Sequence, residues 1–278
     1  MRFLGTRQTP RPVAAILGVP YDGTQSYRRG AAQGPEAIRA ASWSLETYSP
    51  VLHRDLEAHL AVADLGDLPV AGLDPSAMVE VVARTVASLD ADTAPVLLGG
   101  DHTLTLGAVR ALVARHPDLR VVQFDAHADL REVYEGNRLS HASVMRRVWE
   151  VVGDGRIVQL GIRSGIQEEF EFARAHCRWS LGALALPDTV RHELQQVPVY
   201  LTLDLDVLDP AFAPGVGNPE PGGPSFQDLC GALRGLGRLR VVGLDVVELA
   251  PPLDPSGVSA VVAAKLLREV LLQFFTAG

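Results

Sequence analysis

Six short runs of consecutive apolar residues, most of them followed by a helical pattern, constrain the fold of this chain more than any other feature. The apolar runs cover residues 13–18, 96–98, 120–124, 156–160, 199–205 and 239–246. Helical patterns fall at residues 35–41, 76–89, 103–115, 143–151, 168–175, 225–236 and 258–275. Strands that are apolar along their whole length and alternate with helices predict a parallel sheet covered on both faces. We therefore expect one α/β domain over residues 1–278, with three α/β/α layers and a mostly parallel central sheet.

Composition narrows the partners and the chemistry. Lys and Arg total 25 against 33 Asp and Glu, a formal net charge of −8 without any basic run, which argues against nucleic acid or an anionic membrane as a partner. Lys265 is the only lysine, which excludes a P-loop lysine. Cys177 and Cys230 lie far apart in apolar surroundings, so we expect reduced thiols and a cytoplasmic protein. The most apolar stretch, residues 258–275, carries polar residues at helical spacing, which predicts a docked amphipathic helix rather than a membrane span.

Acidic and histidine side chains follow three of the predicted strands. They are His102 after residues 96–98, Asp125, His127 and Asp129 after residues 120–124, and Asp204 and Asp206 at the end of residues 199–205. The carboxyl ends of parallel strands meet at one edge of a sheet, where ligand sites form. While the backbone stays extended, alternate side chains point the same way, so each acidic segment would present its side chains on one face.

Each of these motifs taken alone has an ordinary structural explanation. A histidine at a strand end is usually a satisfied polar residue, and an aspartate beside Gly or Pro is usually a turn, which is how we interpret Asp209 before Pro210. Three such strand ends are difficult to explain as independent turns, because carboxylates gathered at one point are costly unless a cation neutralises them. Two imidazoles and four carboxylates exceed the needs of one ion and predict two Mn²⁺ ions sharing bridging carboxylates. The reaction class that follows is metal-assisted hydrolysis.

The order and spacing of the motifs resemble the ureohydrolases, the family of arginases and agmatinases, over nearly the whole chain. The motifs are Gly-Val-Pro-Tyr-Asp from Gly18, Gly-Gly-Asp-His from Gly99, Asp-Ala-His-Ala-Asp from Asp125, Ser-His-Ala-Ser from Ser140, Asp-Leu-Asp-Val-Leu-Asp-Pro from Asp204 and Asp-Val-Val-Glu from Asp245. The resemblance implies one Mn²⁺ held by His102, Asp125, Asp129 and Asp204, and another held by His127, Asp125, Asp204 and Asp206. It also implies a homo-oligomer, commonly a trimer or a hexamer.

The same resemblance implies a reaction and further site residues. A hydroxide bridging the two ions would attack the guanidinium carbon, and Asp129 would pass the hydroxide proton to the leaving amine, giving urea and an amine. Glu248 would pair with the substrate guanidinium, since a carboxylate holds a planar cation well through two hydrogen bonds. His141 would act as a proton shuttle, for which an unperturbed pKa of about 6.5 is suited. An ordinary strand-end carboxylate and a plain loop histidine are the alternatives, and Asp101 and Asp245 are weaker candidates for orienting the ligands.

The substrate is less well determined than the reaction. Arginases carry an Asn two residues after the Asp-x-His-x-Asp motif, whereas this chain has Arg131, and Asn218 stands where the family often has Thr. Residues 134–141 and the Glu-Pro-Gly-Gly segment at 220–223 look most like agmatinases. An acidic mouth formed by Glu132 and Glu135 would suit a cationic tail, but Arg131 facing the pocket would favour a carboxylate tail. We expect a small cationic guanidino substrate, agmatine, cleaved to putrescine and urea, ahead of a guanidino acid such as 4-guanidinobutyrate and of arginine.

Two other classes of protein remain as alternatives. A noncatalytic metal-binding relative of the same fold would be favoured by a substituted ligand, but all six ligand positions carry the expected residue types. A different binuclear hydrolase, such as a phosphatase or an amide deacetylase, is the second alternative. Glu248 argues against a phosphate substrate, because it would repel an anion.

Overall fold

The computed structural model describes residues 1–237 and 239–276, and within them eight strands form one sheet in the order β4-β1-β5-β10-β9-β6-β7-β8. Every neighbouring pair in this sheet is parallel. The strands are β1 (Ala14–Val19), β4 (Val62–Asp67), β5 (Ala94–Gly99), β6 (Arg120–Phe124), β7 (Ile157–Leu160), β8 (Trp179–Leu181), β9 (Pro198–Asp204) and β10 (Arg240–Val247). A separate antiparallel pair consists of β2 (Tyr48–Ser49) and β3 (Arg54–Asp55).

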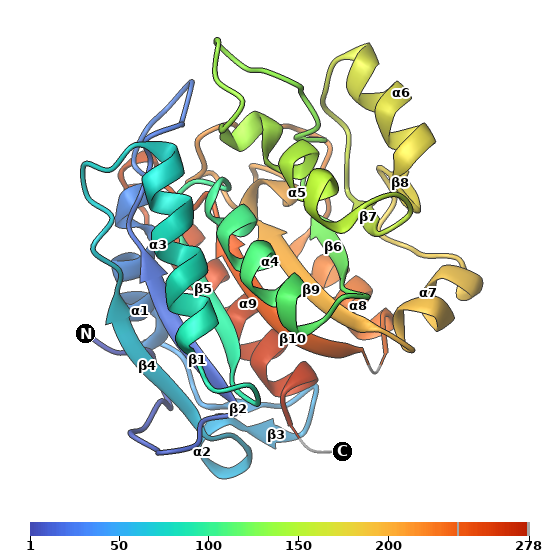
Figure 1. Cartoon of the computed structure of the whole chain (residues 1–278). Coiled ribbons are helices and arrows are strands. Elements are labelled where there is room, and N and C mark those ends of the chain that lie inside the picture. Colours follow the sequence, from blue (N-terminus) through green and yellow to red (C-terminus); the bar gives the residue numbers. More distant parts are fainter. Residues whose placement is uncertain (238, 277–278) are drawn as a thin grey trace.

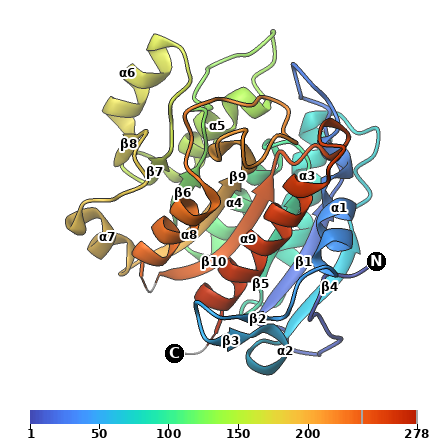
Figure 2. The same cartoon turned by 180° about the vertical axis from the view of Figure 1, so that it is seen from behind.

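Helices cover both faces of the sheet, which confirms the three-layer α/β/α architecture (Figure 1). The face turned to the viewer in Figure 1 carries α3 (Pro75–Ser88), α4 (Leu104–Arg115), α5 (Val144–Val152) and α6 (Gln167–His176). The opposite face, seen in Figure 2, carries α1 (Gly34–Ser42), α8 (Phe226–Gly235) and α9 (Val258–Phe274). Two short helices, α2 (Leu56–His59) and α7 (Asp188–Leu194), lie at the margins.

The central strands are mostly apolar because both of their faces are buried. Ile16 and Leu98 belong to one apolar cluster, whereas Leu17 and Leu97 belong to a second cluster on the other side of the sheet. All six predicted strands are confirmed. The edge strands β4 and β8 were not predicted. β8 has only three residues, and the apolar pattern of β4 is interrupted by Asp64, which is buried and paired with Arg39.

The polar residues of α9 have a more specific role than the predicted amphipathic pattern implies. Lys265 is exposed, but Arg268 and Glu269 are buried and form an ion pair. Arg268 donates to the carbonyl of Glu46, and the hydroxyl of Ser49 donates to Glu269 at 2.8 Å. This polar group therefore holds the segment that leads into the β2–β3 hairpin against the helix.

Two smaller expectations concern membranes and thiols. No helix among residues 1–237 and 239–276 combines the length and the apolar character needed to cross a membrane. Cys177 and Cys230 are free thiols, as predicted.

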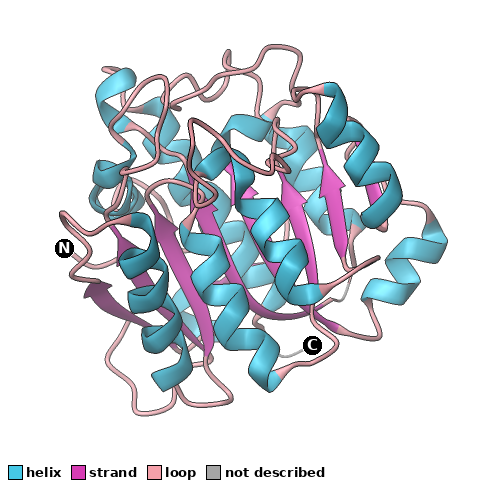
Figure 3. Cartoon of the chain, turned by 45° about the horizontal axis from the view of Figure 1, so that its top comes forward, coloured by secondary structure: helices cyan, strands magenta, loops and turns pink. Residues whose placement is uncertain are grey.

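Parallel strands place all of their carboxyl ends at the same edge of the sheet. Long loops gather over that edge in Figure 3, where the strand arrows end. The six predicted metal ligands and Glu248 lie at or just after strand ends at this edge, and His141 lies in the segment that connects β6 to α5. The fold therefore brings segments from distant parts of the sequence to one place.

Candidate metal centre and substrate pocket

The first of two histidine-centred groups surrounds His102, which follows β5. Its Nδ1 atom lies 3.1 Å from Oδ2 of Asp129, 3.2 Å from Oδ2 of Asp125 and 3.3 Å from Oδ2 of Asp204. The four side chains come from the ends of β5, β6 and β9. The set is the one that the family resemblance assigns to one metal ion.

The second group surrounds His127. Its Nδ1 atom lies 2.9 Å from Oδ2 of Asp206 and 3.7 Å from Oδ1 of Asp125. Asp125 therefore faces both groups, with one oxygen toward each histidine. Together the two groups contain all six predicted ligands. Five of them form two clusters that could each hold a metal ion, and Asp204 lies beside His102.

Turns, rather than extended strands, bring these side chains together, so the predicted alternation along a strand is wrong. β6 ends before Asp125, whose Oδ1 accepts a hydrogen bond from the backbone N–H of His127 at 2.6 Å. Asp129 has a positive φ of 54°, a left-handed conformation that turns its side chain back toward the cluster. β9 ends at Asp204, whose Oδ1 accepts from the N–H of Asp206 in a short 3₁₀ turn. Asp125 and Asp204 therefore each accept a hydrogen bond from the backbone N–H two residues further along the chain, and this bond fixes the orientation of the carboxylate.

The electrostatics of the cluster provide a test of whether these residues fit metal ions. Burial, together with repulsion from Asp206 and Asp125, raises the pKa of Asp204 well above its usual range, and burial raises the pKa of Asp129 to about 7. Among the described residues, none hydrogen-bonds to the fully buried Nδ1 of His102, although three carboxylates face it. A bare imidazole nitrogen beside mutually repelling carboxylates is a donor set for divalent cations. The residues therefore fit two such ions.

Buried polar residues inside the apolar strands orient the ligands. Thr202 Oγ1 lies 2.8 Å from Nε2 of His102, on the side of the ring away from the aspartates. Gln123 donates to Oδ2 of Asp125 at 2.7 Å and also accepts from Gln159 at 2.7 Å. Sequence analysis missed these residues, although a polar residue inside a fully apolar strand is itself a signal, because its burial needs a partner.

Asp101 and Asp245 lie one residue further from the cluster than its predicted ligands. Oδ2 of Asp101 accepts from the N–H and the hydroxyl of Thr24, at 2.9 and 3.0 Å. Oδ2 of Asp245 accepts from Thr105 and from Tyr200, each at 2.7 Å. Asp245 also hydrogen-bonds to Thr202, which contacts His102, and Thr24 in turn accepts from the backbone N–H of His141. An orienting role for the two carboxylates therefore stays a prediction, and it would act through these threonines.

Glu248 and His141 lie next to the cluster and to each other. Glu248 has a positive φ of 66°; its Oε1 accepts from the backbone N–H of His102 at 2.8 Å, and its Oε2 accepts from Gln25 at 2.9 Å. Nδ1 of His141 lies 3.8 Å from Oε1 of Glu248, and its Nε2 lies 3.2 Å from the hydroxyl of Ser26. The guanidinium-binding and proton-shuttle candidates are therefore neighbours.

Burial sets the charge states of these two side chains in the absence of a ligand. It raises the pKa of Glu248 to about 8, with Asp101 adding to the effect. It lowers the pKa of His141 to about 4, to which His102 and His127 also contribute. The imidazole is therefore neutral at pH 7, and its pKa in the ligand-free protein lies below the value of about 6.5 from which the shuttle role was predicted. A cationic ligand against Glu248 would favour its charged form.

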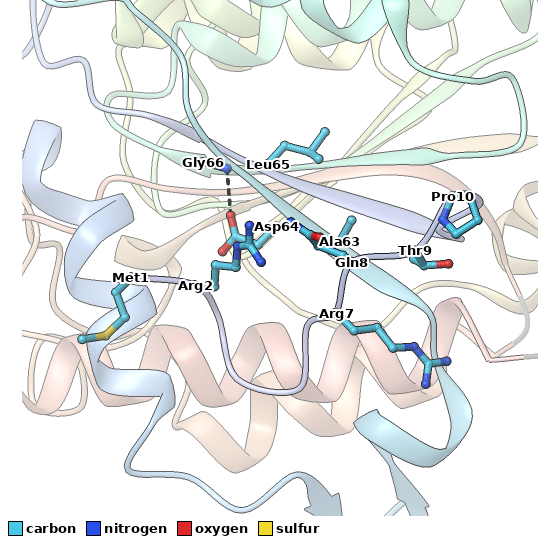
Figure 4. Close-up of a pocket in the computed structure, with 10 residues that line it drawn as sticks. All are labelled: Met1, Arg2, Arg7, Gln8, Thr9, Pro10, Ala63, Asp64, Leu65 and Gly66. Carbon is cyan, nitrogen blue, oxygen red and sulfur yellow. Dashed lines mark hydrogen bonds between the residues drawn. The ribbon is translucent and has the colours of Figure 1, made fainter.

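A cavity of about 530 Å³ connects this cluster with solvent. Besides predicted ligands, His141 and Glu248, its lining includes Ser26, Tyr27, Arg131, Tyr134, Glu169, Asn218 and Glu220. A larger cavity, of about 780 Å³, lies between residues 1–10 and β4 (Figure 4). Its buried carboxylate, Asp64, is already bound by Arg39 and by the N–H of Gly66. The chemistry therefore belongs to the smaller cavity.

The acidic mouth expected from Glu132 and Glu135 is wrong. Glu132 forms ion pairs with Arg138 and Arg146, and Glu135 is exposed in a turn. Neither residue belongs to the described lining of the cavity, which contains Glu220 instead. The mistake arose because neighbours in the sequence were assumed to face the same way.

Arg131 does line the cavity, but its charge is paired. Its Nε lies 3.5 Å from Oε2 of Glu169, and its guanidinium carbon lies 5.0 Å from the ring centre of Tyr134. Glu169 is 3% exposed and also accepts from the N–H of Leu130, so its position is well determined. Because an anion and an aromatic face offset the guanidinium, Arg131 is a weaker obstacle to a cationic tail than its sequence position indicates.

Arg163 joins a metal-ligand loop to the cavity wall. It donates to the backbone carbonyls of Asp206 and Glu220, at 2.9 and 2.6 Å. The turn predicted at Asp209 is confirmed, since its Oδ1 accepts from the N–H of Ala211, and its Oδ2 accepts from Gly222 at 2.7 Å. Sequence analysis did not identify Arg163, because its partners are backbone atoms of segments distant in the chain.

Comparison with known proteins places this site in a family. The model of the Arginase family matches residues 13–273. An agmatinase of Bacillus subtilis is 39% identical over 98% of this chain and 96% of its own length. The chain belongs to the arginase family. As the motifs predicted, it is a ureohydrolase-type hydrolase that acts on guanidino compounds.

Two further relatives of this arginase-family protein have related names. The N(1)-aminopropylagmatine ureohydrolase of Thermococcus kodakarensis is 42% identical, over 91% of this chain and 87% of the relative. The solved structure of the agmatine ureohydrolase of Thermoplasma volcanium is 37% identical and superimposes with a TM-score of 0.83, over 94% of this chain and 89% of that one. The predicted three-layer α/β/α fold is therefore confirmed as the fold of the arginase family.

Proposed function

We propose that this protein is a binuclear manganese amidinohydrolase that cleaves agmatine to putrescine and urea. One observation carries the proposal: Glu248, a carboxylate suited to a guanidinium, lines the same cavity as four of the six residues of the His/Asp cluster. A guanidinium paired with Glu248 would have its carbon beside the groups that activate a nucleophile. The agmatinase and agmatine ureohydrolase relatives support agmatine as that substrate.

The donor atoms support manganese in both positions. The His102 group and the His127 group would each hold one Mn²⁺, because imidazole and carboxylate ligands without thiolates suit this ion. When bound, the two ions would lower the pKa of a shared water and so supply the nucleophile near neutral pH.

The chain's own residues bind the substrate and move protons. Glu248 would hold the guanidinium through charge-assisted hydrogen bonds. Asp129, whose Oδ2 lies 3.1 Å from Nδ1 of His102, would accept the nucleophile's proton and release it to the leaving amine. His141, hydrogen-bonded to Ser26 through Nε2, would carry protons between the cavity and solvent.

Agmatine remains ahead of the other guanidines. The pairing of Arg131 with Glu169 and the presence of Glu220 in the lining favour a cationic tail. A guanidino acid such as 4-guanidinobutyrate is second, since Arg131 still lines the cavity, and arginine is third. We also propose that the protein is cytoplasmic and forms a homotrimer or a homohexamer, which light scattering would distinguish. The putrescine that the reaction releases would enter polyamine biosynthesis.

Urea release from a guanidine panel tests the function directly. The Mn²⁺-loaded protein is assayed with agmatine, N(1)-aminopropylagmatine, 4-guanidinobutyrate, 3-guanidinopropionate and arginine, and kcat/KM is compared. We expect the highest value with agmatine. The absence of urea from every compound, with two metal ions bound per chain, would overturn the proposal. A highest value with 4-guanidinobutyrate would keep the reaction and replace the substrate.

A further inference from the structure

Gln25 connects the N-terminal loop of the site to Glu248. It lies in the loop between β1 and α1, is 5% exposed, and forms three side-chain hydrogen bonds. Nε2 donates to Oε2 of Glu248 at 2.9 Å, across 223 positions of the sequence. Oε1 accepts from the backbone N–H groups of Gly30 and Ala31, at 3.1 and 3.3 Å. Both the oxygen and the NH₂ group of this buried amide therefore have hydrogen-bond partners.

The two ends of this amide are not interchangeable. Two backbone N–H donors occupy the oxygen, which leaves the NH₂ group to face Glu248. The other carboxylate oxygen accepts from the backbone N–H of His102. Each oxygen of Glu248 therefore receives one fixed donor from the protein and keeps a further lone pair. Two fixed donors on opposite oxygens determine the plane of the carboxylate, and hence the plane in which it can meet a flat cation.

The contact between Gln25 and Glu248 is closely packed. A Cβ atom at Gly217 would lie 3.0 Å from Nε2 of Gln25 and 3.7 Å from Oε2 of Glu248. The carbonyl of Gly217 in turn accepts from Arg28, so the glycine is held against the amide. Glycine at this position therefore allows the loop after β9 to cover the hydrogen bond.

We propose that Gln25 is a positioning residue that aligns Glu248 with the substrate guanidinium. The inference rests on the proposed ureohydrolase function and assigns the alignment to a residue that lies in none of the predicted motifs. On this proposal Gln25 affects the substrate through its hydrogen bond to Glu248. Its loss should weaken binding of the guanidinium and leave the metal ligands in place.

Two substitutions separate alignment from support of the loop. Gln25→Glu keeps an acceptor for Gly30 and Ala31 but replaces the donor with a second carboxylate. Gln25→Met keeps the volume and removes both functions. We expect each to raise the KM for agmatine by roughly tenfold to a hundredfold, the range for a lost hydrogen bond to a charged group, with a smaller change in kcat. Metal content measured by atomic emission should stay at the wild-type value.

A matched control and a double-mutant cycle complete the test. Gln273→Met removes a side-chain hydrogen bond to the carbonyl of Leu233, at the opposite end of α9 from the site, and should leave the KM unchanged. In a Glu248→Gln background, Gln25→Met should change kcat/KM by less than about threefold, because the carboxylate that Gln25 aligns is already absent.

The outcomes are distinct. An unchanged KM in Gln25→Glu, or additive losses in the cycle, would overturn the positioning role while agmatine hydrolysis by the wild type upholds the function. A lower melting temperature with an unchanged KM would show a purely structural role and would also overturn it. Failure of the wild type to hydrolyse any guanidine would overturn the function and, with it, this inference.

Discussion

Thr202 determines which nitrogen of His102 faces the carboxylate cluster. Its hydroxyl oxygen lies 2.8 Å from Nε2, whereas the aspartate oxygens lie around Nδ1 at 3.1 to 3.3 Å. If Nε2 carries the proton and donates it to Thr202, then Nδ1 presents a lone pair to a cation. A partner behind a ligating histidine fixes both the tautomer and the ring orientation.

The first prediction concerns this hydroxyl. Thr202→Val preserves the shape of the side chain and removes the partner of Nε2. We expect the affinity for Mn²⁺ to fall by about tenfold to a hundredfold, measured by competition with a chelator. Thr85→Val, which removes a hydroxyl that only binds a carbonyl within α3, is the control. Equal Mn²⁺ affinities for Thr202→Val and the wild type would contradict the assigned role.

The second prediction separates substrate binding from metal binding. Glu248→Gln should keep the metal content and lower kcat/KM for agmatine by at least about tenfold, because the charge-assisted pair with the guanidinium is lost. His127→Ala or Asp204→Ala should instead lower metal content and activity together. Glu168→Gln, an exposed residue on α6, is the control. Wild-type activity in Glu248→Gln would refute the pairing.

The third prediction concerns the paired charge in the cavity wall. Arg131→Met should change the ratio of kcat/KM values for agmatine and 4-guanidinobutyrate by less than about fivefold, because Glu169 and Tyr134 already offset the guanidinium. A much larger shift toward agmatine in this variant would show that Arg131 selects for the tail carboxylate. Steady-state kinetics with both substrates make the distinction.

The fourth prediction follows from a carboxylate that caps the start of α9. Burial alone would raise the pKa of Asp254, but hydrogen bonds from Ser256 and Ser259 outweigh it and lower the pKa from 3.8 to about 2. A carboxyl whose pKa is lower in the folded state stabilises the fold above its unfolded pKa, and this contribution is lost as the pH falls through the folded value. Asp254→Asn should therefore cost roughly 2 kcal/mol at pH 7 and progressively less between about pH 4 and pH 2.

Urea unfolding at several pH values measures this dependence. Asp92→Asn, an exposed residue before β5, is the control and should show no comparable loss. A cost for Asp254→Asn that stays constant down to pH 2 would mean that its charge is not responsible.

Much of the site could be predicted because strand ends converge in a parallel sheet. His102, Asp125 and Asp204 lie at or just after the ends of three mostly apolar strands, and the topology alone brings those strand ends to one edge. The expected reason for the orientation of Asp129 was wrong, because its backbone has a left-handed conformation instead of an extended one. The periodicity of apolar and polar residues along a segment does not reveal a turn of this kind.

The charges around the cavity could not be predicted in the same way. Glu132 and Arg131 are adjacent in the sequence, yet Glu132 pairs with arginines outside the cavity and Arg131 pairs with Glu169 at the edge of the cavity. The partner of a charged side chain depends on which segments the fold places beside it. That information is absent from the spacing of residues along one segment.

The sequence by itself determined the central strands, the edge at which they converge and the chemical types of the metal-site residues, because burial on both faces and ligand chemistry leave local patterns. Only the tertiary structure decided how those residues are held. Gln25 on Glu248, Thr202 on His102 and Glu169 on Arg131 are contacts between residues separated by 223, 100 and 38 positions. Hydrogen bonds and ion pairs of this kind depend on distance in space, which the order of residues does not specify.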